Sequence, residues 1–259
     1  MSAFLFDEIV FGPVQSRRLG VSLGINLLPV ACKYCNFDCI YCECGWNADH
    51  QIKKNALPTR QEIYAALERK LTGMQQSDKL PDAITFAGNG EPTIHPDFSG
   101  IIDDTVTLRN RYAPYSKISV LSNATMLHRQ KVADALKKAD MPILKLDSAF
   151  DTTIQLLNQP AKKISVTGLI EQFSSFGKQC IVQTMFVQGV YRGQTVDNTT
   201  PVELDAWEQA ILTICPGQVM IYTIARDTPT DTLRKVSGEK LREIAARIKK
   251  HGIPAQVSE

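Results

Sequence analysis

Short apolar runs alternate along the chain with longer stretches in which apolar residues recur every three or four positions. The short runs predict six buried strands, at 21–28, 83–87, 118–121, 143–148, 180–187 and 219–225. The longer stretches predict seven helices, one beginning near Thr59 and the others over about 96–111, 131–139, 151–158, 165–176, 203–214 and 239–250. Strands that alternate with helices predict parallel pairing with right-handed crossovers, in an open doubly wound sheet or a barrel-like curl.

No composition shift or linker interrupts this alternation. The chain has 259 residues, with no internal repeat and no low-complexity tract, so we expect one domain over residues 1–259. Residues 189–200 are expected to form a loop at the mouth of the fold, where substrate contacts concentrate. The segment Gly252-Ile253-Pro254 is expected to lead to a short tail.

Five of the seven cysteines lie within thirteen residues, from Cys32 to Cys44. Cys35, Cys39 and Cys42 have the spacing C-x3-C-x2-C, so three thiolates on one short loop can converge on one inorganic cluster. A zinc site normally separates two C-x2-C pairs by about 15–20 residues, whereas three residues separate them here. The odd number of cysteines and the lack of a secretory leader count against disulfides.

Small and polar residues follow the ends of the second and third predicted strands. Gly88, Gly90 and Glu91 let the backbone approach a ligand closely while one carboxylate is held at the strand end, although an ordinary tight turn uses the same residue types. Ser122 and Asn123 follow the third predicted strand, where small polar residues can cap the next helix.

Charged and polar residues also mark the last three predicted strands. Lys145 and Asp147 lie on one face of the fourth strand, which is costly in a buried strand unless the charges are paired or contact a ligand. Gln183 is polar in an otherwise apolar strand. Arg226 follows the sixth strand and either binds a carboxylate of a ligand or forms a surface ion pair.

The segment Cys35-x3-Cys39-x-Tyr41-Cys42, with its aromatic residue before the third cysteine, resembles the signature of the radical S-adenosylmethionine (SAM) superfamily. The resemblance implies that these cysteines, in a cluster loop over residues 32–45, hold three irons of a 4Fe-4S cluster and that SAM chelates the fourth iron. One coordination position is thereby left open, as in other catalytic metal sites.

Cys32 and Cys44 are interpreted as spare thiols; if either ligated the fourth iron, the site would be closed and suited to electron transfer. The resemblance also implies a partial (β/α)6 barrel with the cluster at the carboxyl ends of the strands. The segment 12–20, which reads Gly-Pro-Val-x-Ser-Arg-Arg-Leu-Gly, resembles the opening of the wyosine-type tRNA-modifying subgroup. No cysteine precedes Cys32, so we expect no second, N-terminal cluster of the kind found in true wyosine synthases.

The resemblance further implies SAM contacts at the strand ends. The family's Gly-Gly-Glu motif, which binds the SAM amino group, corresponds to Gly88, Gly90 and Glu91, with Asn89 displacing the second glycine. The family touches SAM after the third strand, and its fourth strand contacts the ribose and carboxylate of SAM. The full set of predicted cofactor-binding residues is Gly88, Gly90, Glu91, Ser122, Asn123, Lys145, Asp147, Gln183 and Arg226.

The reaction implied by the resemblance is reductive cleavage of SAM to methionine and a 5′-deoxyadenosyl radical, which abstracts a hydrogen atom from a substrate. The protein positions the cofactor and excludes water. We expect an electron donor such as flavodoxin or ferredoxin. Nucleic-acid, peptide or protein, and small-molecule substrates stay open. A glycyl-radical-enzyme activase and a non-catalytic iron–sulfur electron-transfer protein are the alternative functions.

Composition adds only weak constraints. Hydrophobic residues make up 44% of the chain and charged residues 22%, as in ordinary globular proteins. A net charge of +2 and a pI near 8.1 fall short of the basic field of a protein that grips nucleic acid mainly through phosphates. The sequence contains no run of about 18 apolar residues, so we expect no membrane partner. A reducing cytoplasmic location is expected.

Overall fold

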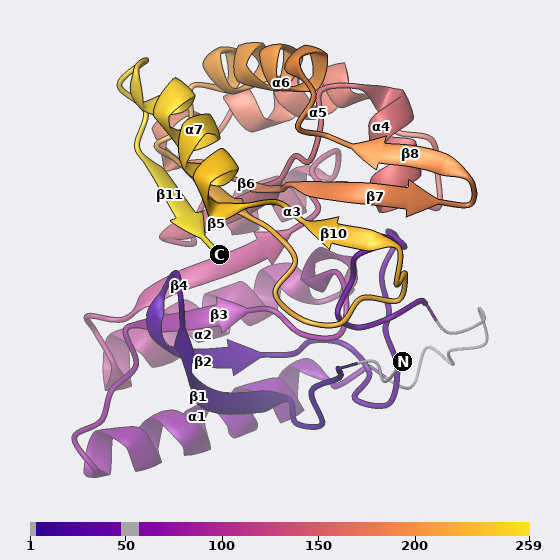
Figure 1. Cartoon of the computed structure of the whole chain (residues 1–259). Coiled ribbons are helices and arrows are strands. Elements are labelled where there is room, and N and C mark those ends of the chain that lie inside the picture. The colour runs from indigo at the N-terminus through magenta and orange to yellow at the C-terminus, as the bar shows by residue number, and fades with distance from the viewer. Residues whose placement is uncertain (1–3, 48–56) are drawn as a thin grey trace.

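The computed structural model describes residues 4–47 and 57–259. Its main element is a curled eight-stranded sheet with the strand order β1-β2-β3-β4-β5-β6-β9-β11 (Figure 1). The six central strands pair in parallel and coincide with the six predicted strands, which confirms the predicted partial barrel. They are β2 (Gly20–Ile25), β3 (Ala83–Phe86), β4 (Lys117–Ser122), β5 (Met141–Lys145), β6 (Ile181–Met185) and β9 (Gln218–Tyr222).

Two further strands form the edges of the sheet. β1 (Val10–Ser16) pairs with β2 in antiparallel orientation, and β11 (Ala255–Ser258) pairs with β9 in parallel. The prediction of a tail at the end of the chain was therefore wrong, because residues Ala255–Ser258 form β11. This segment is too short and too polar to predict a strand by itself, and it becomes one because its backbone groups pair with β9.

Helices lie on the outer side of the curled sheet (Figure 1). They are α1 (Arg60–Gln76), α2 (Phe98–Tyr112), α3 (Gln130–Leu136), α4 (Asp151–Asn158), α5 (Val166–Ser174), α6 (Pro201–Ile214) and α7 (Gly238–Lys249). Apolar residues of both layers form the main hydrophobic core, whose members lie between Val10 and Ile253 in the sequence. Within the described ranges, no helix combines the length and apolar character needed to cross a membrane.

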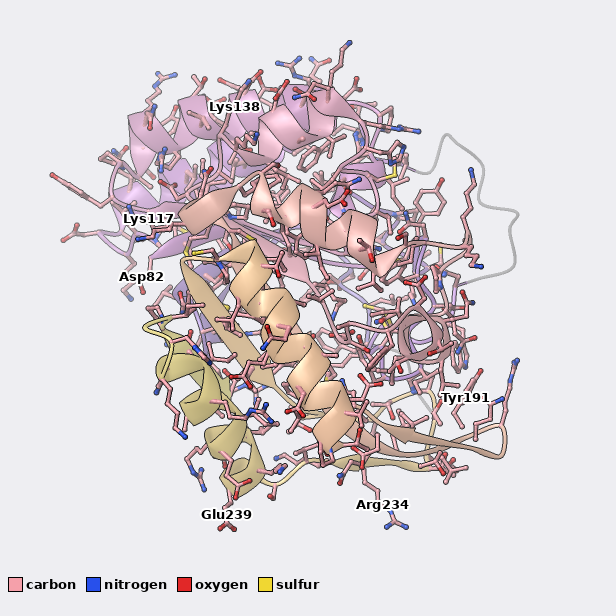
Figure 2. The ribbon with its side chains drawn as sticks, turned by 90° about the horizontal axis from the view of Figure 1, so that it is seen from above. Asp82, Lys117, Lys138, Tyr191, Arg234 and Glu239 are labelled. Carbon is pink, nitrogen blue, oxygen red and sulfur yellow. The ribbon has the colours of Figure 1, made fainter. Side chains whose placement is uncertain are left out.

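The predicted mouth loop at 189–200 is instead a β-hairpin, which corrects the sequence-based prediction. β7 (Val187–Tyr191) and β8 (Gln194–Asp197) pair in antiparallel orientation, and β10 (Leu233–Lys235) pairs with β7. Arg192 and Gly193 form the two-residue turn, both with positive φ, as a tight hairpin requires. Figure 2 shows Tyr191, next to this turn, far from Asp82 and Lys117, which lie where β3 and β4 begin.

Candidate active site

The cysteine loop follows β2 and crosses the carboxyl ends of the parallel strands (Figure 1). One side of the loop is fixed to the end of β3, because the Tyr34 amide donates to the Asn89 carbonyl at 2.7 Å and the Glu91 amide donates to the Tyr34 carbonyl at 3.2 Å. A Cβ atom on Gly90 would lie 1.9 Å from the Tyr34 oxygen, and φ at Gly90 is +143°. Only glycine allows this approach, so the glycine positions the loop.

The other side of the loop is fixed to the last turn of α4. The Asp38 amide donates to the Asn158 carbonyl at 2.9 Å, and the Ile40 amide donates to the Leu157 carbonyl at 3.0 Å. The last carbonyls of a helix have no partner within the helix, so the loop satisfies groups that would otherwise be unpaired. The cysteine loop is thereby held between β3 and α4.

The loop covers a cavity of about 280 Å³ at the carboxyl ends of the strands. The thiols of Cys35, Cys39 and Cys42 line it, and Cys44 lines it with them. Seven of the nine predicted cofactor-binding residues also line this cavity, namely Gly88, Gly90, Glu91, Ser122, Asn123, Lys145 and Gln183. The structure thus brings together residues that are far apart in the sequence.

The thiols of the cavity differ in acidity. Burial raises the pKa of Cys35, with the nearby Glu91 adding to the effect, and burial raises the pKa of Cys39 to about 11. A hydrogen bond with the Cys44 thiol lowers the pKa of Cys42, and the same bond raises the pKa of Cys44. Cys42 is therefore the member of the trio that gives up its proton most readily in the metal-free protein.

A buried cation, Lys33, accompanies the thiols. Its ammonium group donates to the Asp38 carboxylate and to the Gly45 carbonyl, each at 2.9 Å, and its side chain is 1% exposed. Burial alone would lower the pKa of Lys33, but the combined charge of the thiolates, above all that of Cys42, raises it. The site therefore holds a fixed positive charge beside its sulfur ligands.

Glu91 provides a buried carboxylate on the cavity wall. It accepts hydrogen bonds from the Asn123 amide at 2.6 Å, from the Ser122 hydroxyl at 2.8 Å and from the Thr93 amide at 3.1 Å. Burial raises the pKa of Glu91, and these hydrogen bonds oppose the increase. Ser122 and the Asn123 backbone therefore orient the Glu91 carboxylate, in addition to lining the cavity themselves.

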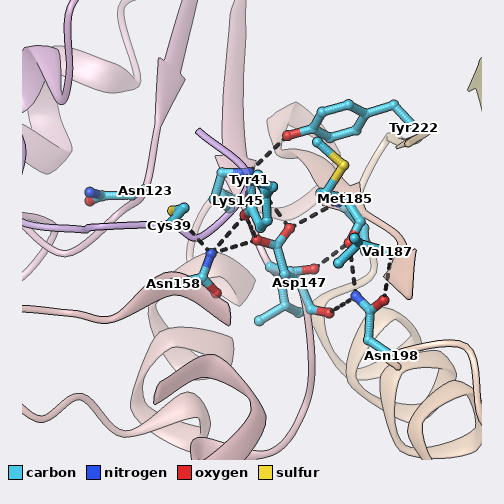
Figure 3. A network of polar contacts seen from close by, with 12 residues as sticks. Cys39, Tyr41, Asn123, Lys145, Asp147, Asn158, Met185, Val187, Asn198 and Tyr222 are labelled. Atoms are coloured by element: carbon cyan, nitrogen blue, oxygen red, sulfur yellow. Dashed lines mark hydrogen bonds and ion pairs between the residues drawn. The ribbon is translucent and has the colours of Figure 1, made fainter. Parts of the chain in front are cut away.

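Asp147 lies behind the cysteine loop and does not line the cavity. Figure 3 shows its carboxylate at the centre of a polar network: it accepts hydrogen bonds from the Tyr41 hydroxyl, from Asn158 Nδ2 at 2.6 Å and from the Met185 amide at 2.9 Å. Lys145 Nζ lies 3.6 Å from the same carboxylate. Asp147 therefore anchors the aromatic residue of the cysteine motif, which sequence reasoning did not foresee.

Arg226 also lies outside the cavity lining. Its exposed guanidinium donates to Glu43 at 2.8 Å and lies 4.9 Å from the centre of the Phe4 ring. Of the two interpretations offered by the sequence, the structure favours the surface ion pair. Arg226 is therefore not among the residues that the structure brings to the cavity.

Sequence reasoning missed other residues of this region. Tyr222, at the end of β9, accepts a hydrogen bond from Lys145 Nζ at 2.8 Å and lines the cavity. Asn158 donates to the Cys39 sulfur at 3.3 Å as well as to Asp147. The position of Tyr222 at a strand end was a usable signal, whereas no local pattern distinguishes Asn158 from a helix-terminal asparagine.

The chemistry of the donor set fits an iron–sulfur cluster. Between residues 4 and 47 and from residue 57 onward, no three or more His, Cys, Asp and Glu side chains are placed to hold a single metal ion. Three thiols nevertheless line one cavity. This arrangement suits a group with several metal atoms, each taking one thiolate, better than zinc, which gathers about four ligands around one ion.

Comparison with known proteins assigns the class. The sequence model of the radical SAM superfamily matches residues 30–190, more than half of the chain. The chain therefore belongs to the radical SAM superfamily, a family of enzymes whose cofactors are SAM and a 4Fe-4S cluster. The matched range contains the cysteine loop and all seven predicted cofactor-binding residues that line the cavity.

Two curated relatives match different shares of their own length. The chain is 29% identical over 238 residues to a protein named GTPase Obg from Brachyspira hyodysenteriae, covering 90% of this chain and 32% of that protein. It is 30% identical over 186 residues to UPF0026 protein MJ1312 from Methanocaldococcus jannaschii, covering 70% of this chain and 55% of that protein. The chain thus spans about a third of the first relative's length and just over half of the second's.

Solved structures share the fold at low sequence identity. A radical SAM methyltransferase from Sphaerobacter thermophilus superimposes with a TM-score of 0.67 at 14% identity, over 92% of this chain and 65% of that chain. An archaeal TYW1 gives a TM-score of 0.52 at 12% identity, over 88% and 71%. These likenesses show the fold alone, so membership of the wyosine-type subgroup stays a prediction.

Proposed function

We propose that this protein is an enzyme that reductively cleaves SAM and uses the resulting radical to abstract a hydrogen atom from a substrate. The observation that carries the proposal is the shared cavity, which is lined by the three motif cysteines, by Glu91 and by polar residues of β4, β5 and β6. A protein that only carried electrons would need the thiols but not this polar wall.

The residues divide into ligands and positioning groups. Cys35, Cys39 and Cys42 would hold the cluster, which together with SAM supplies a 5′-deoxyadenosyl radical on reduction. Gly88, Gly90 and Glu91 would bind the SAM amino group, because a buried carboxylate is a suitable partner for an ammonium group. Ser122, Asn123, Lys145 and Gln183 complete the wall. Asp147 acts indirectly, by holding Tyr41 and hence the loop.

The proposal includes a reducing partner and a reducing compartment. We propose flavodoxin or ferredoxin as the electron donor and the cytoplasm as the location, without a membrane partner, because a reducing compartment suits an oxygen-sensitive cluster. The wyosine-type resemblance makes a tRNA base one candidate substrate, beside peptides and small molecules. A glycyl-radical enzyme is a further candidate partner if the protein is an activase.

The test is anaerobic reconstitution with iron and sulfide, followed by addition of SAM and dithionite. We expect 5′-deoxyadenosine from the wild type and from the control Cys215→Ala, which changes an exposed cysteine outside the cavity. We expect none from Cys39→Ala. A correctly formed cluster that yields no 5′-deoxyadenosine would instead favour electron transfer, or a closed site ligated by Cys32 or Cys44.

A further inference from the structure

A second cavity, of about 150 Å³, lies inside the curl of the sheet and adjoins the cysteine cavity. The two cavities share Arg18, Leu121 and Gln183 as lining residues. Most of the inner wall is apolar, and no acidic residue lines it. The apolar lining comprises Phe6, Phe11, Val14, Leu19, Ala87, Leu121, Ile143 and Met220.

The N-terminal segment and the β1–β2 hairpin supply one wall of this inner cavity. The Phe6 and Phe11 rings stack with centroids 3.6 Å apart, and a Cβ atom on Gly24 would lie 2.1 Å from the Phe11 ring. The glycine in β2 therefore leaves room for the Phe11 ring beside the strand. Because this wall is closely packed, the inner cavity is pre-formed and does not require a ligand to open it.

Arg18 brings an unpaired cation to the boundary of the two cavities. Its guanidinium lies 5.0 Å from the centre of the Tyr222 ring. Its Nη1 atom is buried and has no hydrogen-bond partner, and Arg18 makes no ion pair with any residue in the described part of the chain. The neighbouring Arg17, by contrast, is exposed and donates to the main-chain carbonyl of Glu259. A buried guanidinium nitrogen without a partner is costly, which points to a ligand that supplies an acceptor.

Gln183 provides an independent observation on the same boundary. The residue is 5% exposed and lines both cavities. Its side-chain amide makes no hydrogen bond with the described residues, although its backbone pairs within the sheet. Buried amide groups are normally hydrogen-bonded, so this group is also available to a ligand. The Ser22 and Thr85 hydroxyls also line the inner cavity, and they bond to each other at 2.7 Å.

We propose that the inner cavity is the substrate pocket and that it binds an oxyanion, a carboxylate or a phosphate, carried on a small substrate or on the end of a larger one. Arg18 and Gln183 would bind the oxyanion, and the apolar wall would take a short carbon body. A cavity of 150 Å³ corresponds to the liquid volume of about five water molecules, which is room for the acid group and a few carbon atoms of the substrate. This assignment rests on the proposed function, since it supplies that reaction's substrate class.

The test is calorimetric titration of the cluster-loaded protein with inorganic phosphate and, separately, with butyrate, at constant ionic strength and with and without saturating SAM. The wild type should bind at least one anion, and the stronger of the two identifies the substrate's acid group. Arg18→Gln should weaken this binding about tenfold or more, as the loss of a charged hydrogen-bonding partner implies. The matched control Arg17→Gln should change it less than twofold.

Three results would overturn the assignment: no binding of either anion to the wild type, equal binding by Arg18→Gln, or binding that saturating SAM abolishes. The last result would make Arg18 a contact of the SAM carboxylate. If Arg18→Gln fails to fold, Gln183→Leu decides, with an expected threefold or greater loss. Formation of 5′-deoxyadenosine on the same samples is read separately, so failure of SAM cleavage is distinguishable from failure of the anion pocket.

Discussion

Replacing Asp147 by alanine should destabilise the protein more than any single surface change. The Asp147 side chain is fully buried, and its carboxylate joins four segments of the chain: the cysteine loop, β5, the end of α4 and the end of β6. The main-chain carbonyl of Asp147 also accepts from Asn198 Nδ2 at 2.8 Å, and Asn198 Oδ1 accepts from the Val187 amide at 2.9 Å. The Asp147→Ala variant keeps this backbone contact, so only the carboxylate bonds are lost.

The magnitude follows from the partners that Asp147→Ala leaves behind. Lys145 loses its only carboxylate within 4 Å among the described residues, and breaking a buried ion pair costs about 3–5 kcal/mol. The Met185 amide loses its acceptor, while Tyr41 and Asn158 still bond to each other at 2.7 Å. The costs overlap, so we expect a loss of about 4 kcal/mol of unfolding free energy, a large share of the 5–15 kcal/mol typical of proteins.

Urea unfolding of the metal-free protein, followed anaerobically, measures this loss. Tyr41→Phe should cost about 1.5–3 kcal/mol, as expected for a hydrogen bond to a charged group. The double variant should lose less than the sum of the two, because both changes remove the same bond. Asp103→Ala, which breaks an exposed ion pair with Lys138, is the control and should change stability by less than about 1 kcal/mol.

A loss below about 1 kcal/mol for Asp147→Ala would refute this reasoning. Asp147 would then not be an anchor, and the role suggested by the family resemblance, a contact with SAM, would become the better explanation. Strict additivity with Tyr41→Phe would also contradict the network, because it would show that the two side chains act independently.

Three further experiments test the loop. Gly90→Ala should lower the unfolding free energy by about 1–3 kcal/mol through backbone strain alone, and it should reduce iron uptake. The control Gly73→Ala, in open space on α1, should raise the unfolding free energy by about 0.5–1 kcal/mol. Urea unfolding measures both changes in stability. Lys33→Met should make the cluster's midpoint potential more negative by about 60 mV, because a cation favours the reduced state; redox titration followed by EPR measures it. In metal-free protein at pH 7, iodoacetamide should label Cys42 before Cys35, as mass spectrometry would show, because the lowered pKa of Cys42 leaves more thiolate.

Each of these has its own counter-result. Unchanged iron uptake in Gly90→Ala would show that the loop is not positioned by the close approach to Tyr34. A potential shifted equally by Lys70→Met, which changes an exposed lysine on α1, would remove the special role of Lys33. Faster labelling of Cys35 than of Cys42 would mean that accessibility, and not acidity, controls the thiols.

Much of this arrangement could be predicted from the sequence, because its determinants are local. The six central strands follow from short apolar runs, and α1 begins at Thr59 with the reciprocal Thr59–Glu62 hydrogen bonds that the residue types allow. The cysteine spacing puts three thiols on one loop, and strand-end positions place Glu91 beside them, since the carboxyl ends of parallel strands meet at one edge.

The rest depends on contacts that sequence patterns do not encode. Alternation puts Lys145 and Asp147 on the same face, but the partner that buries Asp147 is Tyr41, 106 positions earlier in the chain. The hairpin after β6 carried a usable signal in Gly193, which the prediction of a loop ignored. β11 had none, because four residues become a strand only by pairing with β9.

The same contacts explain why an acid entering the site would go to Arg18. Two cations flank the Tyr222 ring: Lys145 Nζ lies 5.4 Å from its centre, and the Arg18 guanidinium lies 5.0 Å from it. Asp147 compensates the charge of Lys145 from behind the loop, whereas nothing in the described chain compensates Arg18. The Asp147 carboxylate therefore has two effects. It holds Tyr41 in place, and it neutralises Lys145, so that Arg18 is the cation of this pair that can bind an anionic ligand.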